Sequence, residues 1–323
     1  MKTICNLVVF GLVLAASNIV LRCDAARFKV ERTGGKMVEY YRNHPMGNGN
    51  NYFSKAVIVI HGTNRNADEY YDTVNDARTD IGDSRTLVFA PKFQTYADNP
   101  GSDELYWSSG GWKKGYKSKD GSSTSSFVVI DDILEAISSR FPSVKQITIV
   151  GHSAGGQFVQ RYAGVGLGPN FIRTDIDVRY IVSNPSSYMF LTSSRPNNWS
   201  PTTTGCDEYD EYKYGLDDMP GHLSYANVNN INKSEIKDNL ILREVYLLLG
   251  MEDNDPNSNY LDTSCEANAQ GGHRLARGMN YFDHVKDYDS NANTHEHTVP
   301  GVGHSSSGMF SSDEGIDLIF WFK

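Results

Sequence analysis

The chain has 323 residues, of which 39% are hydrophobic and 11% aromatic, and its formal net charge is −9. This composition supplies enough apolar material for the core of one large domain or two small ones. An acidic chain is poorly suited to bind phosphate backbones or anionic membranes, so we expect no nucleic acid and no stable membrane anchor among its partners.

The first 25 residues have the pattern of a secretory signal peptide. Lys2 gives a positive start, an apolar stretch follows, and Cys23 and Ala25 are small residues at the −3 and −1 positions of a cleavage site after Ala25. A membrane anchor is the alternative, although polar residues interrupt the apolar run. We therefore expect a secreted, extracellular protein with residues 26–323 as its domain.

Short apolar and β-branched runs recur along the chain, and several are apolar at every position. Such continuous runs are typical of strands that are buried on both faces of a parallel sheet. Amphipathic helical patterns over 130–141, from 158 onward and over 316–322 lie between or after these runs. This alternation predicts an α/β architecture, with a mostly parallel central sheet and helices on both faces. The predicted strands are 56–60, 86–90, 146–150, 178–182, 244–249 and 295–299.

Residues 184–240 break this alternation. They are rich in Asn, Ser, Tyr, Pro and Thr, and they are too long for an ordinary connecting loop. We interpret them as an inserted cap that is anchored by several tyrosines and a cysteine. We expect the tyrosines to line a substrate cleft, together with Trp107 and Trp112 from an earlier aromatic loop. Packing beneath a surface loop is the alternative for the two tryptophans.

Two cysteines, Cys206 and Cys265, remain once the signal peptide is removed. In an oxidising compartment we expect them to form a disulfide bond that ties the cap to the loop following Asp253. Their spacing does not suggest a zinc site, and we expect neither a metal nor a cofactor. Asn198 and Asn232 begin the sequons Asn-Trp-Ser and Asn-Lys-Ser, which predict a glycoprotein.

The stretch Gly151–Gly155 reads GHSAG and matches the pattern G-x-S-x-G. A predicted strand leads into it and a predicted helix leaves it, which is the setting that exposes a nucleophilic serine on a sharp turn. Side chains in place of the two glycines would collide with the crossing strand and helix. The motif predicts Ser153 as a nucleophile, and a glycine-rich turn without catalysis is the alternative.

A nucleophilic serine needs an acid and a base, which should follow it along the chain in that order. His304 lies in a glycine-rich loop just after the last predicted strand and is the predicted base. Asp253 follows the apolar run of EVYLLLGMED and is the predicted acid, with Asp255 as the alternative acid. Residues 253–262 also partly resemble a calcium-binding loop, although the glycine at its sixth place and the glutamate at its twelfth are missing.

We expect the oxyanion hole to consist of two backbone amides, those of Thr63 and Ala154. Thr63 lies in the stretch HGTN, which follows the first predicted strand, and Ala154 follows the nucleophile. A plain turn at His61 and Gly62 is the alternative. His152 is expected to point away from the nucleophile.

The motifs HGTN, GHSAGG, LLGMED and PGVGHS come in the order and spacing of secreted serine hydrolases with the α/β-hydrolase fold, and the chain resembles that family over residues 50–320. The resemblance implies an esterase-like enzyme that cleaves carboxylic esters through an acyl-enzyme. The superfamily also contains amidases and peptidases, as well as members that have lost catalysis. A serine peptidase or amidase, or a non-catalytic secreted binding or matrix protein on this fold, therefore remains an alternative. The size of the ester substrate is not predicted.

Overall fold

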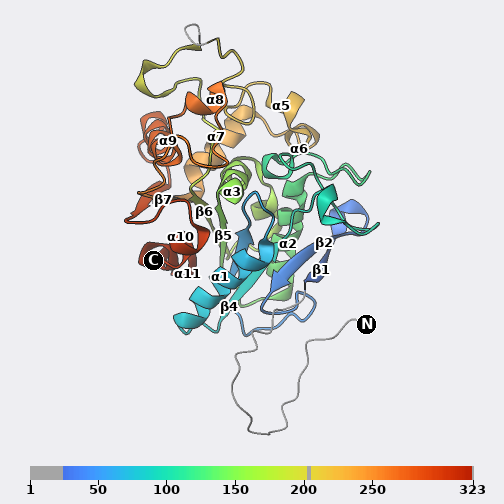
Figure 1. Ribbon diagram of the computed structural model, residues 1–323. Coiled ribbons are helices and arrows are strands. Elements are labelled where there is room, and N and C mark those ends of the chain that lie inside the picture. Colours follow the sequence, from blue (N-terminus) through green and yellow to red (C-terminus); the bar gives the residue numbers. More distant parts are fainter. Residues whose placement is uncertain (1–24, 202–204, 322–323) are drawn as a thin grey trace.

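The computed structural model describes residues 25–201 and 205–321, and the predicted signal peptide up to residue 24 lies outside them (Figure 1). The described residues form a sheet with the strand order β1-β2-β4-β3-β5-β6-β7-β8. Strands β3 to β8 are parallel, whereas β1 and β2 form an antiparallel edge. The strands are β1 (Ala26–Val30), β2 (Lys36–Arg42), β3 (Lys55–Ile60), β4 (Thr86–Pro91), β5 (Gln146–His152), β6 (Asp177–Ser183), β7 (Glu244–Gly250) and β8 (Thr294–Val299).

The predicted α/β class with a mostly parallel sheet is confirmed, and each of the six predicted strands is present with nearly the predicted bounds. The helical patterns that begin at residues 130, 158 and 316 correspond to α2, α3 and α11. The helices are α1 (Ala67–Asp80), α2 (Ser126–Arg140), α3 (Ala154–Val165), α5 (Met219–His222), α6 (Ser224–Val228), α7 (Lys233–Leu242), α8 (Cys265–Asn268), α9 (Arg274–Tyr288), α10 (Ser306–Phe310) and α11 (Asp313–Phe320).

Helices cover both faces of the sheet because alternate side chains of each strand point to opposite sides. In β3, Val57 and Val59 belong to the hydrophobic core shared with α1, α10 and α11. Ile58 and Ile60 belong to the core shared with α2, α3, α7 and α9. Figure 1 shows the helices α1, α10 and α11 together, below β7 in this view. Each of these fully buried side chains contributes about 1.5–3 kcal/mol to folding.

The segment between β6 and β7 is part of the main fold. It gathers with α8 at the top of Figure 1, and its final helix, α7, packs on α3. Tyr225 is buried there and donates its hydroxyl proton to Asp131 of α2 at 2.6 Å, while Tyr162 of α3 donates to the same carboxyl group at 2.7 Å. Burial raises the pKa of Asp131 to about 6. The segment is therefore fastened to the helices beneath it through a shared buried carboxyl group.

Two local features hold the ends of this segment. The predicted disulfide between Cys206 and Cys265 is present and joins the segment to α8. Asn232 precedes α7 and forms a capping box: its side chain accepts from the backbone N–H groups of Ser234 and Glu235, and the Glu235 carboxylate accepts from the Asn232 N–H at 2.8 Å. Asn232 is exposed, and the side chain of the other sequon asparagine, Asn198, lies outside the described residues.

None of the helices in the described ranges has the length and hydrophobicity that crossing a bilayer requires.

Candidate active site

Ser153 occupies a strained turn between β5 and α3. Its φ and ψ angles are 59° and −117°, in a region that side-chain-bearing residues rarely adopt. Neighbouring glycines make the turn possible, because a Cβ atom on Gly155 would lie 2.2 Å from the Ile60 carbonyl oxygen and one on Gly151 would lie 2.4 Å from the Gly155 backbone. The turn therefore projects Ser153 from the carboxyl end of the central strand.

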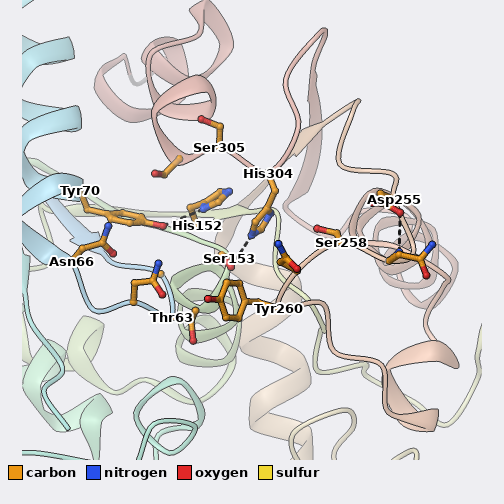
Figure 2. A pocket seen from close by; sticks show the side chains of 15 residues that line it. Thr63, Asn66, Tyr70, His152, Ser153, Asp255, Ser258, Tyr260, His304 and Ser305 are labelled. Carbon is orange, nitrogen blue, oxygen red and sulfur yellow. Dashed lines mark hydrogen bonds between the residues drawn. The ribbon is translucent and has the colours of Figure 1, made fainter. Parts of the chain in front are cut away.

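His304 connects the serine to an acid. Its Nε2 atom lies 2.9 Å from Ser153 Oγ (Figure 2). Its Nδ1 atom lies 2.7 Å from Asp253 Oδ2. His304 follows β8 and Asp253 follows β7, so both come from loops at the same edge of the sheet. With the ring proton on Nδ1, His304 donates to the carboxylate and accepts from the serine hydroxyl. The structure thus brings together the predicted nucleophile, base and acid, which are far apart in the sequence.

Asp255, the alternative acid, lines the same pocket, but the carboxylate that contacts His304 is that of Asp253. Asp255 is exposed, and its Oδ1 atom accepts from the backbone N–H of Asn257 at 2.8 Å. Figure 2 shows it on the far side of the loop from His304. Asp262 pairs instead with Lys213. The three carboxylates of the segment that resembles a calcium loop, those of Asp253, Asp255 and Asp262, therefore each contact a different partner.

A buried arginine that the sequence did not reveal, Arg274 at the start of α9, holds the acid. Its NH1 group lies 3.3 Å from the second oxygen of Asp253, Oδ1, and donates to Ser258 Oγ at 2.8 Å. Its NH2 group donates to the carbonyl oxygen of Asn259 at 2.8 Å. Burial lowers the pKa of Arg274, and the Asp253 charge opposes this shift. One guanidinium thus joins the acid to the loop that follows it.

The two predicted oxyanion donors lie on adjoining elements. Ala154 is the first residue of α3, so its N–H has no acceptor within the helix. Thr63 lines the same pocket as Ser153 (Figure 2) and follows β3, whose last carbonyl oxygen, that of Ile60, would lie 2.2 Å from a Cβ atom on Gly155. An ion pair between Arg65 Nε and Asp98 Oδ2 at 2.7 Å anchors this loop. Thr63 and Ala154 therefore remain the predicted donors to an oxyanion that forms at Ser153.

His61 supports the same loop from inside the protein. Its Nε2 atom accepts from the backbone N–H of Phe93 at 2.9 Å, and its Nδ1 atom lies 2.8 Å from the Gly62 carbonyl oxygen. Burial lowers the pKa of His61 to about 4, so the ring is neutral near pH 7. His61 is therefore a structural residue that orients the backbone ahead of Thr63.

His152 does not point away, contrary to the prediction. Its ring centroid lies 4.5 Å from that of His304, and its Nδ1 atom lies 3.2 Å from the hydroxyl of Tyr70. Burial lowers the pKa of His152 well below its usual value, and the nearby His304 and Arg274 lower it further. A neutral imidazole thus supports one face of the His304 ring.

The pocket around Ser153 has a volume of about 620 Å³ and a polar lining. Of the residues that the structure describes, no Leu, Ile, Val, Met, Phe or Trp contributes to it, and none of its lining residues comes from 184–201 or 205–240. Tyr260 is 74% exposed, adopts a positive φ of 59° and lies beside Thr63 in Figure 2. The lining consists of Gly62, Thr63, Asn64, Asn66, Tyr70, His152, Ser153, Asp255, Asn257, Ser258, Asn259, Tyr260, His304, Ser305 and Ser306.

The expectation that cap tyrosines and two tryptophans line the cleft is therefore wrong. Trp107 and Trp112 are buried, and Trp112 stacks on Phe93 with ring centroids 5.5 Å apart. Trp112 also packs against His61 at 4.6 Å. The alternative that we considered for these tryptophans, packing beneath a loop, describes them correctly.

No model of a known protein family matches the chain, and no curated protein matches its sequence. Solved structures do match it. Poly(aspartic acid) hydrolase-1 from Sphingomonas sp. KT-1 has a TM-score of 0.64 and 24% identity, with 93% of this chain and 100% of that chain covered. LpqC, a poly(3-hydroxybutyrate) depolymerase from Bordetella parapertussis, has a TM-score of 0.63 and 20% identity, with 92% and 89% covered. At these identities the likeness is one of fold, and the chain has the α/β-hydrolase fold.

Proposed function

We propose that the protein is a secreted serine hydrolase that cleaves carboxylic esters through an acyl-enzyme. The observation that carries this proposal is the continuous chain of hydrogen bonds from Ser153 through His304 to Asp253, at 2.9 and 2.7 Å. Such a chain provides a nucleophile, a base and an orienting acid within proton-transfer reach.

The reaction follows from these positions. His304 Nε2 removes the proton of Ser153 as its Oγ atom attacks the ester carbonyl carbon, and Asp253 stabilises the imidazolium that forms. The amides of Thr63 and Ala154 stabilise the tetrahedral oxyanion. When this intermediate collapses, the carbon–oxygen bond to the alcohol breaks and His304 donates its proton to the leaving oxygen. Water, activated by His304, then attacks the acyl-enzyme and releases the acid.

Three further observations support the choice of esters and of secretion. One similar solved structure is named a poly(3-hydroxybutyrate) depolymerase, and poly(3-hydroxybutyrate) is a polyester. The disulfide between Cys206 and Cys265 is typical of proteins that mature in an oxidising compartment. Strand β1 begins at Ala26, so cleavage after Ala25 would leave every described strand intact.

The direct test is labelling of the purified protein with a fluorophosphonate, which reacts with activated serines. We expect the wild type to be labelled and Ser153→Ala to be unlabelled, with Ser305→Ala as a matched control because Ser305 lines the same pocket outside the hydrogen-bonded chain. Hydrolysis of p-nitrophenyl acetate compared with a peptide p-nitroanilide then separates an esterase from a peptidase. A folded wild type that neither reacts with the probe nor hydrolyses the ester would refute the proposal.

A further inference from the structure

Four basic side chains from three parts of the fold gather beside α3, although the chain as a whole is acidic. They are Lys113 and Lys114 of the short 3-10 helix η3 (Trp112–Lys114), Arg161 of α3, and Lys213. The Arg161 guanidinium donates to the carbonyl oxygens of Lys113 at 3.2 Å and of Lys213 at 3.4 Å, which holds the separate segments together. We refer to these four residues as the basic cluster.

The basic cluster is poorly compensated. Lys213 Nζ lies 2.9 Å from Asp262 Oδ2, and Tyr214 donates its hydroxyl proton to the same oxygen at 2.9 Å. Within the described residues, no carboxylate lies within ion-pair distance of the ammonium groups of Lys113 and Lys114. One carboxylate in direct contact therefore faces four positive charges.

Lys113 and Lys114, which have no carboxylate partner among the described residues, are also partly withdrawn from water; the Lys114 ammonium group lies over the Tyr116 ring, 5.4 Å from its centroid. Burial, followed by the charges of Lys213 and Arg161, lowers the pKa of Lys113 to about 8, and the same causes lower the pKa of Lys114 to about 8. Charges that are desolvated and crowded by like charges gain free energy when an anion binds among them.

Two segments of the chain connect the basic cluster to the catalytic pocket, although its four residues do not themselves line that pocket. Trp112, which directly precedes Lys113, packs on the ring of His61, and His61 precedes the pocket-lining Gly62 and Thr63. On the other side, Asp262 lies two residues after the pocket-lining Tyr260, a separation of at most about 7 Å. Thr63 and Tyr260 both line the catalytic pocket (Figure 2). Both connections therefore lead to residues of this pocket.

We propose that Lys113, Lys114 and Lys213 form a subsite for a negatively charged group of the ester substrate. This inference rests on the proposed function and adds the substrate class: a polar ester with an anionic group, such as a carboxylate, at a short distance from the scissile carbonyl. Among the described residues the pocket lining offers many hydrogen-bonding groups and no aliphatic side chain, which suits a polar ester better than a long-chain lipid.

Two esters with the same leaving group test the inference: the p-nitrophenyl monoester of glutaric acid, which carries a free carboxylate, and p-nitrophenyl pentanoate, which is neutral. We expect wild type to have the higher kcat/KM for the anionic ester at low salt. Lys113→Gln and Lys114→Gln should each lower the ratio of the two kcat/KM values about tenfold, since each removes a charged contact. Added salt should lower the wild-type ratio as well.

Lys117→Gln is the matched control, because Lys117 is an exposed lysine just beyond η3 and outside the basic cluster. Folding of the variants is checked by thermal unfolding. The main-chain oxygens of Lys113 and Lys114, which accept from Arg161 and Tyr212, are unaffected by these substitutions.

The failures are distinguishable. If Ser153 reacts with the fluorophosphonate and the neutral ester is hydrolysed, but neither lysine variant changes the ratio, the subsite is refuted and the proposed function stands. If Ser153 is unreactive and neither ester is hydrolysed, both are refuted. A ratio that changes equally in Lys117→Gln also refutes the subsite, because the effect is then one of overall charge.

Discussion

Replacing Arg274 with methionine should weaken both the fold and the catalytic geometry, because this one side chain serves both. Arg274 is 1% exposed, and it contacts Asp253, Ser258 and Asn259. Methionine fills part of the same volume but provides no charge and no donor. Asp253 would then remain buried with His304 as its partner, and the loop through Ser258 and Asn259 would lose its attachment to α9.

The expected loss of stability follows from the distance. Two unit charges 3.3 Å apart attract each other by about 5 kcal/mol at an effective dielectric constant of about 20. Part of this attraction offsets the cost of burying both charges, so we expect Arg274→Met to lower the free energy of unfolding by about 3 kcal/mol. A shift of the acid or loop by about 1 Å would lower kcat/KM about a hundredfold.

Urea unfolding and the pH–rate profile of p-nitrophenyl acetate hydrolysis test this role. Removing a positive charge near His304 should move the acidic limb of the profile to higher pH, whereas a purely structural loss would leave the limb in place. Arg274→Lys keeps the charge and should restore the limb, but it cannot make all three contacts and should restore kcat/KM only in part. If Arg274→Met unfolds at the wild-type urea concentration with an unchanged profile, Arg274 does not position the acid.

Three other predictions follow from the site and its surroundings. Asp253→Asn should lower kcat about ten-thousandfold, because an amide cannot stabilise the imidazolium, whereas Asp255→Asn should stay within about tenfold of wild type in the same ester assay. Equal losses in both variants would contradict the assignment of the acid. Replacing Cys206 and Cys265 with serine opens a link across 59 residues and should lower the free energy of unfolding by about 4 kcal/mol, seen as a lower thermal midpoint. Because the pKa of His61 is lowered to about 4, the unfolded chain binds this proton more readily than the folded one between pH 6.5 and 4. Urea unfolding across this window should therefore show stability falling as the pH falls, by up to about 3 kcal/mol from this residue, and a flat profile would contradict the burial of a neutral ring.

The parallel strands could be predicted because each is apolar along most of its length and is followed by a distinctive turn. The polar helices α1 and α9 could not, since their sequences contain many charged residues and few apolar ones. The edge strands β1 and β2 are short or interrupted by charged residues, at alternate positions in β1 and at every third position in β2, which gives only a weak signal. The helices α1 and α9 and the strands β1 and β2 therefore depend on tertiary contacts that the sequence pattern does not show.

The same distinction applies to the site. Ser153 and His304 could be predicted because each lies in a glycine-rich segment, which indicates a sharp turn of the chain. Asp253 could be predicted because it follows an apolar strand. Arg274 lies in an ordinary helix-start sequence, and its burial depends on how α9 approaches β7. The sequence does not distinguish whether a tyrosine of 184–240 lines a cleft or belongs to the core, because aromatic residues suit both. The packing against α2 and α3 in the structure decides between these two roles.

The capping role of Asn232 has a practical consequence for glycan analysis. A sugar would attach through its Nδ2 atom, while Oδ1 is the atom that accepts from Ser234 and Glu235 at the start of α7. The common substitution of asparagine by glutamine would therefore remove the helix cap together with the carbohydrate site, at a cost of about 1 kcal/mol. Changing Ser234 to alanine abolishes the acceptor sequence and leaves the cap in place. A difference in mass between wild type and Ser234→Ala that exceeds the one oxygen atom removed by the substitution can therefore be attributed to the carbohydrate.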